Sequence, residues 1–125
     1  MADKIKLVQG DTKPNLIVNL TDQTTGLPIG IVGATPRLKL RASGSSTISA
    51  TLIGTPIAGF LQEDGTVNSN APYNVAGAGG RCVFAWTTDS LAVAGDFDGE
   101  VEITFSDASI QTVYDLLKFK IRDQF

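Results

Sequence analysis

Four carboxylates recur at every second position near the carboxyl end of this sequence: Asp96, Asp98, Glu100 and Glu102. A row of this kind could bind Ca²⁺ or supply the acid pair of a glycosidase. The calcium-loop pattern, however, needs further oxygen ligands and a distant bidentate Glu, which do not follow Glu102. Two basic rows have the same period: Arg37, Lys39 and Arg41, and Lys118, Lys120 and Arg122. These rows could neutralise the acids across neighbouring strands. We therefore expect a solvated, charge-paired sheet face, with no metal site and no catalytic residue.

The other reactive groups have no partner that would activate them. The sequence contains no histidine, which removes the commonest general base and every nucleophile that depends on a histidine. Cys82 is the single cysteine and lies in an apolar segment, so we expect a buried, inert thiol. The run Gly77-Ala78-Gly79-Gly80-Arg81 lacks the Lys and Ser/Thr of a P-loop. We expect it to be a flexible approach to a strand, and we expect neither enzymatic activity nor a cofactor.

The composition is that of one globular domain spanning residues 1–125. The chain is 42% hydrophobic and 18% charged, which argues against disorder and against a coiled coil. Its net charge of -3 lacks the basic footprint of a nucleic-acid-binding protein, so we expect no nucleic-acid partner. No apolar run approaches the roughly 18 residues of a membrane span. We expect neither a signal peptide nor a membrane association.

Short apolar clusters alternate with polar residues between turn-forming segments, a rhythm typical of an all-β protein. The strands that it predicts cover residues 14–21, 36–42, 48–54, 81–86, 97–105 and 110–122. We expect the second and third to pair as a β-hairpin, the fourth to be a central strand covered on both faces, and the last two to form a closing hairpin. The extended piece Leu27-Pro28-Ile29 would lie at an edge. About seven or eight strands in all predict an antiparallel β-sandwich, immunoglobulin-like in a loose sense.

The segments between these strands offer two further features. Residues 63–80 are rich in turn formers and predict a long surface loop with Tyr73 outside. Residues 89–94 could form one helical turn capped by Asp89 or Ser90. Four aromatic residues are expected in the core, although a sugar-binding platform would use the same residue type. These aromatics are Phe84, Trp86, Phe105 and Phe119.

Several turn motifs make the chain resemble the amino-terminal domain of tailed-phage baseplate upper proteins. The matching residues are Gln9-Gly10-Asp11-Thr12, Leu16-Ile17-Val18-Asn19-Leu20, Gly26-Leu27-Pro28-Ile29, Gly33-Ala34-Thr35, Leu38-Lys39-Leu40-Arg41 and Gly95-Asp96-Phe97-Asp98-Gly99-Glu100. In that family the domain is a β-sandwich that anchors receptor-binding proteins to the tail. Longer members continue into a helical, trimerising stalk, whereas this sequence ends at Phe125.

The resemblance implies a non-enzymatic structural protein of a tailed bacteriophage particle, made in the host bacterial cytoplasm and placed at the tail, baseplate or neck. Its partners would be other virion subunits, including further copies of itself, bound through strand edges and loops. The contact residues that we expect are Leu7, Gly10, Asp11, Thr12, Tyr73 and Asn74. A decoration protein on the capsid is the alternative within this class. A carbohydrate-binding module is the alternative from a different class.

Overall fold

The computed structural model describes residues 4–22, 24–87, 89–113 and 116–125, and in these residues it contains strands and no helix. The strands are β1 (Ile5–Val8), β2 (Leu16–Asn19), β3 (Thr35–Ala42), β4 (Ala50–Ile53), β5 (Thr55–Ile57), β6 (Phe60–Leu61), β7 (Val67–Asn68), β8 (Arg81–Phe84), β9 (Gly95–Thr104), β10 (Ile110–Thr112) and β11 (Leu117–Arg122). The all-β prediction is confirmed. The structure has more strands than the seven or eight expected, because it includes several pieces of two or three residues.

The larger sheet has six strands and is built around β9, its longest strand. Its order is β1-β11-β9-β3-β4, and β10 pairs with the distal part of β9 on the same side as β11. All of these neighbours are antiparallel except β1, which runs parallel to β11. The predicted hairpin of residues 36–54 is confirmed by the pairing of β3 with β4.

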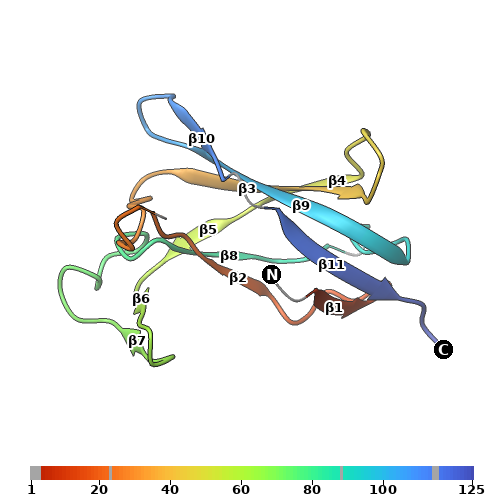
Figure 1. Ribbon diagram of the computed structural model, residues 1–125, viewed down its shortest axis with the longest axis horizontal. Helices are drawn as coiled ribbons and strands as arrows, with labels where there is room; N and C mark the ends of the chain where they lie inside the picture. The colour runs from red at the N-terminus through yellow and green to blue at the C-terminus, as the bar shows by residue number, and fades with distance from the viewer. Residues whose placement is uncertain (1–3, 23, 88, 114–115) are drawn as a thin grey trace.

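A second sheet of three strands, in the order β2-β8-β5, packs below the first, as Figure 1 shows. The chain crosses from the large sheet to the small one at Gly54, between β4 and β5. A Cβ there would lie 2.7 Å from the Phe84 ring, so only glycine admits this aromatic residue at the crossing. A separate two-stranded hairpin, β6–β7, extends from the lower left of Figure 1.

The core lies between the two sheets and is formed by alternate residues of their strands. The largest fully buried side chains include Phe84 of β8, Phe119 of β11 and Leu38 of β3. The indole of Trp86 meets the Phe119 ring edge to face, with 5.7 Å between centroids, and so joins the small sheet to the large one. Full burial of one such side chain stabilises the fold by roughly 1.5–3 kcal/mol. Several sheets packed on a shared core are consistent with a β-sandwich.

Three sequence-based expectations differ from the structure. Residues 110–122 form two strands rather than one. Thr112 lies opposite Glu102 and Leu117 lies opposite Gly99. The chain therefore advances five residues from β10 to β11 while β9 advances only three, which breaks the continuous pairing. Residues 89–94 form a turn, not a helix, and the Ser90 hydroxyl accepts a hydrogen bond from the Thr87 N–H and donates one to the Thr87 carbonyl. The strand β8 is buried on one face only, because Val83 on its other face is partly open to solvent.

The glycine run before β8 is tightly packed, which corrects the expectation of a flexible approach. Gly77, Gly79 and Gly80 are buried. A Cβ on Gly79 would lie 1.9 Å from the Gly59 carbonyl oxygen, and one on Gly80 would lie 2.3 Å from that of Leu20. The glycines are therefore required for close backbone packing at the start of β8.

Candidate functional site

The acidic row of the sequence lies in the middle of the large sheet, between two basic strands. The sheet order places β9 between β11 and β3. In register, Asp98 faces Arg41 on one side and Lys118 on the other. Farther along, β3 sets Lys39 opposite Glu100. The predicted charge-paired face is therefore confirmed, and the two basic rows act as the partners that the spacing indicated.

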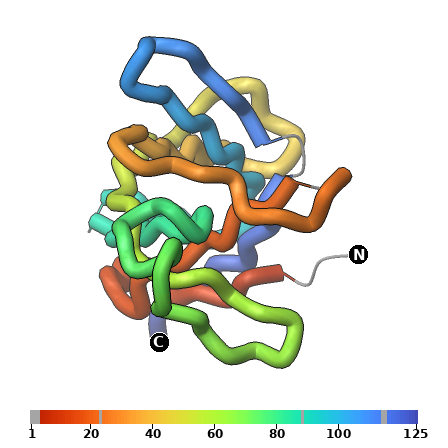
Figure 2. Tube along the Cα trace, turned by 90° about the vertical axis from the view of Figure 1, so that its left-hand side faces the viewer, coloured from red at the N-terminus to blue at the C-terminus, as the bar shows by residue number. Residues whose placement is uncertain are grey.

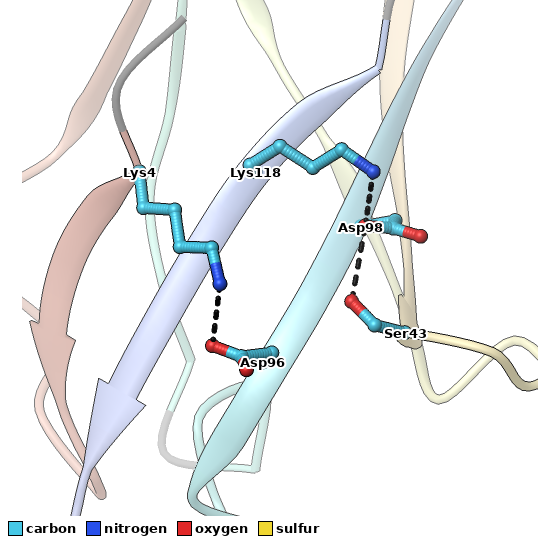
Figure 3. A network of polar contacts seen from close by, with 5 residues as sticks. All are labelled: Lys4, Ser43, Asp96, Asp98 and Lys118. Carbon is cyan, nitrogen blue, oxygen red and sulfur yellow. Dashed lines mark hydrogen bonds and ion pairs between the residues drawn. The ribbon is translucent and has the colours of Figure 1, made fainter.

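Three ion pairs join the acidic row to neighbouring cations, two of them from the basic rows. The Nζ of Lys39 lies 2.8 Å from the Glu102 carboxylate, a diagonal pair in which both side chains are at least two-thirds buried. The Nζ of Lys118 lies 2.8 Å from Asp98 Oδ1. A third pair is visible in Figure 3, where the Nζ of Lys4 reaches Asp96 at 3.1 Å. Three of the four acids are thus paired with cations, which come from β3, from β11 and from the residue before β1.

Asp98 is the most enclosed of these acids, with 8% of its surface exposed. Besides the Lys118 ammonium, the hydroxyl of Ser43 donates a hydrogen bond to Asp98 Oδ1 at 3.1 Å, as Figure 3 shows. The Lys118 hydrogen bond, aided by that of Ser43 and by the charges of Lys118 and Arg41, holds the pKa of Asp98 below its usual value despite the opposing effect of burial. Asp98 is therefore an ionised structural carboxylate, which is the opposite of a general acid.

A pocket beside this row is too small for a drug-sized ligand or a sugar ring. It has a volume of about 80 Å³ and is lined by Lys39, Leu40, Arg41, Ile48, Asp98, Glu100 and Leu116. Ligand pockets span roughly 300–1,000 Å³. Among the described residues, no group of three or more metal-ligating side chains comes together. The interaction that the structure shows on this face is charge pairing between neighbouring strands.

Sequence reasoning missed the third basic strand. β1 carries Lys6 on the same face of the sheet as the Lys118 row, and Lys4 precedes it. The signal was present, since Lys4 and Lys6 alternate with the inward-facing Ile5 and Leu7. A segment of four residues carries too little periodicity to define a strand, and its parallel partner lies more than a hundred residues away.

The six predicted contact residues fall into two separate regions. Leu7 is buried in the core as part of β1, while Gly10 and Thr12 are exposed and Asp11 is half-buried in the turn that follows. Tyr73 is half-buried rather than fully outside, because its ring packs on Phe60 with 5.0 Å between centroids.

Asn74 is exposed in the loop of residues 69–80, which forms the left end of the molecule in Figure 1, away from β1. The structure does not bring the two regions together. Their role in contacts stays a prediction.

The remaining candidate residues serve the core. Phe84, Trp86 and Phe119 are buried and Phe105 is half-buried, so these aromatics do not form an exposed sugar-binding platform. Burial raises the pKa of the Cys82 thiol to about 11, so the thiol stays protonated and unreactive at neutral pH. The expectation of a buried cysteine is confirmed.

Comparisons of the chain with models of protein families, with curated proteins and with solved structures gave no match. In the described part of the chain, no helix is long and apolar enough to cross a membrane.

Proposed function

We propose that this chain is a non-enzymatic structural protein of a tailed bacteriophage particle, with an immunoglobulin-like β-sandwich that docks neighbouring virion subunits at the tail, baseplate or neck. The motif resemblance to baseplate upper proteins supports the assignment of the chain to a tailed-phage particle. The exposed strand edges of the large sheet support the proposal that the chain docks neighbouring subunits.

The observation that carries this proposal is the exposure of isoleucines on short strands at the margins of the large sheet. Ile53 of β4 is 66% exposed and Ile110 of β10 is 63% exposed. β4 ends the sheet order, and β10 pairs with β9 alone. Open edges with apolar side chains favour unwanted association unless another chain covers them. Neighbouring subunits in an assembly would provide that cover.

The turn motifs that carry the resemblance also occupy positions where the fold needs them. Gly10, Gly26 and Gly33 all have positive φ angles, between 71° and 80°, a region that side chains rarely adopt. Each lies in a connection between strands of the described structure. The resemblance therefore rests on residues that shape the backbone, as shared turn geometry would require.

The docking proposal can be tested by occupancy in particles. Phage deleted for this gene would be complemented with the wild-type chain or with Ile53→Lys, Ile110→Lys or the control Val93→Lys. Val93 is equally exposed, at 64%, but lies in a turn outside the strands. We expect at least one edge variant to keep the wild-type melting temperature and lose about tenfold in copies per particle, while the control is retained.

Wild-type occupancy for both edge variants would remove the strand edges from the proposal. The loop needs its own variant, Tyr73→Ala. If this variant folds and assembles at the wild-type level, the loop of residues 69–80 does not dock a subunit.

A further inference from the structure

The charges of the chain are unevenly distributed over the molecule. Eight of the ten Lys and Arg residues lie on or beside the outer face of the large sheet: Lys4, Lys6, Arg37, Lys39, Arg41, Lys118, Lys120 and Arg122. With the four acids of β9, this face has a net charge of +4. Elsewhere the described residues contain seven acids and two cations, a net charge of -5. A protein with a net charge of -3 thus has one distinctly cationic face.

Five cations on this face form no ion pair with a described residue. Arg37 and Arg41 of β3 lie opposite acids of β9, and the other three lie along β1 and β11, where Lys120 also has Asp96 opposite it on β9. Lys6 lies directly opposite Lys120, and Val8 lies opposite Arg122. Among the described residues, none of these three cations forms an ion pair, and Asp123, next in the chain, forms none either. Like charges directly opposite each other destabilise a sheet. An anion placed over them would relieve that repulsion.

A groove follows the same two strands and is lined by Lys6, Leu7, Val8, Lys120 and Arg122. Its lining therefore combines aliphatic and cationic side chains. A complementary partner would present carboxylates beside exposed aliphatic side chains.

The chain itself presents such a surface on the β6–β7 hairpin. Glu63 and Asp64 occupy its turn, and the exposed Leu61 and Val67 face each other across its two strands. Asp64 Oδ1 accepts hydrogen bonds from the Thr66 backbone N–H and hydroxyl at 3.0 and 2.6 Å, which fix the turn and lower the pKa of Asp64. No described cation forms an ion pair with either acid.

The hairpin and the groove lie at opposite ends of the molecule. In Figure 1 the hairpin extends at the lower left, whereas β11 runs to the C-terminus at the lower right. Figure 2 looks at the left end, with the hairpin in light green at the front and the C-terminus behind it. One copy therefore cannot place its own hairpin in its own groove.

We propose that copies of this chain associate head to tail, the β6–β7 hairpin of one copy seated in the β1–β11 groove of the next. Two different surfaces at opposite ends give a heterologous contact, which repeats into a ring or a filament. The inference deepens the proposed function, on which it rests for its biological setting, by naming a second copy as one partner.

Sedimentation of the purified chain from 1 μM to 1 mM tests the contact. Screening lengths fall from about 14 Å at 0.05 M to about 4 Å at 0.5 M ionic strength. We expect growth with concentration in 50 mM NaCl and at least a tenfold weaker association in 500 mM NaCl. A monomer over the whole range in 50 mM NaCl would overturn the inference.

Charge exchange gives the sharper test. The groove variant Lys6→Glu/Arg122→Glu and the hairpin variant Glu63→Lys/Asp64→Asn should each lose self-association. The amide oxygen introduced by Asp64→Asn can still accept the turn hydrogen bonds. Mixed together, the two variants should associate again in equal numbers, because each supplies the charge that the other lacks. The control Lys13→Glu, outside the groove, should associate as the wild type does.

Two results would overturn the inference. One is a folded mixture of the two variants that stays monomeric. The other is a monomeric wild type that binds heparin or single-stranded DNA through Lys6 and Arg122, which would assign the groove to a polyanion. Absence of the chain from washed particles would instead contradict the proposed function, and it would leave the self-association measurement intact.

Discussion

Replacing Asp98 by Asn tests the charge-paired face at its most enclosed point. The substitution keeps the size of the side chain and its ability to accept the Ser43 hydrogen bond, but removes the charge that receives the Lys118 ammonium at 2.8 Å. A hydrogen bond to a charged group contributes roughly 1.5–3 kcal/mol when buried. Because the Lys118 side chain is 44% exposed, we expect a smaller loss of about 1–2 kcal/mol in the free energy of unfolding.

The loss should depend on pH with a defined sign. The pKa of Asp98 is lowered in the folded protein, so its contribution is present at neutral pH and is lost as the pH falls from about 5 through the folded pKa. Asp98→Asn has no such titration. The stability gap between the two proteins should therefore be full at pH 7 and close as the pH falls to about 2.

Urea unfolding followed by Trp86 fluorescence, repeated from pH 7 to pH 2.5, would measure this gap. In a separate thermal unfolding experiment at pH 7, the melting temperature of the Asp98→Asn protein should be about 4–8 °C lower than that of the wild type. Glu100→Gln is the matched control: Glu100 lies on the same strand and face, is half-buried and forms no ion pair with a described residue. Its cost should stay within about 0.5 kcal/mol.

Asp98→Asn being no less stable than Glu100→Gln at pH 7 would contradict a stabilising role for the Asp98 charge, and so would a stability deficit that is the same at pH 7 and pH 2.5. A double-mutant cycle with Lys118→Met isolates the pair. Within that cycle, a coupling near zero would assign the loss to something other than the Lys118 contact.

Three further predictions concern the packing. Gly99→Ala should lose about 1–3 kcal/mol, because the new methyl would lie 2.6 Å from the Phe119 ring; in urea melts the control Gly30→Ala, with open space around it, should change little. The Cys82 thiol should resist a thiol reagent at pH 8 until the protein is unfolded, since burial raises its pKa to about 11, and rapid labelling of the native protein would contradict this. Ala108→Gly should gain up to about 1 kcal/mol in thermal unfolding, because Ala108 has a φ of 70°; an equal or lower melting temperature would be the contrary result.

The parts of the fold that the sequence predicted are those with strong alternation. Residues 36–42 and 97–105 carry long period-two patterns with opposite charges, and their pairing follows from that complementarity alone. The same logic anticipated that Lys118 would meet the acid row. These predictions succeeded because burial on one face and charge on the other specify both the strand and its neighbours.

The parts that could not be predicted depend on distant contacts. β1 is a strand because β11 pairs with it, and a segment of only four residues contains no sequence pattern that would predict a parallel partner. The break between β10 and β11 could not be predicted either. It appears as a two-residue shift in the pairing of these strands with β9, and such a shift depends on the neighbouring strand rather than on the local sequence. Gly79 has an ordinary loop sequence around it, and its need for glycine arises only where the chain passes Gly59. The half-burial of Tyr73 depends in the same way on Phe60.

Quantitative mass spectrometry of purified, well-washed phage particles tests the central claim most directly. The measured quantity is the copy number of this chain relative to the major capsid protein. The account predicts a low, fixed ratio of the kind that a ring at the tail, neck or baseplate gives. A ratio near parity would place the chain on the head as a decoration protein, and its absence from the particles would contradict a structural role in the virion.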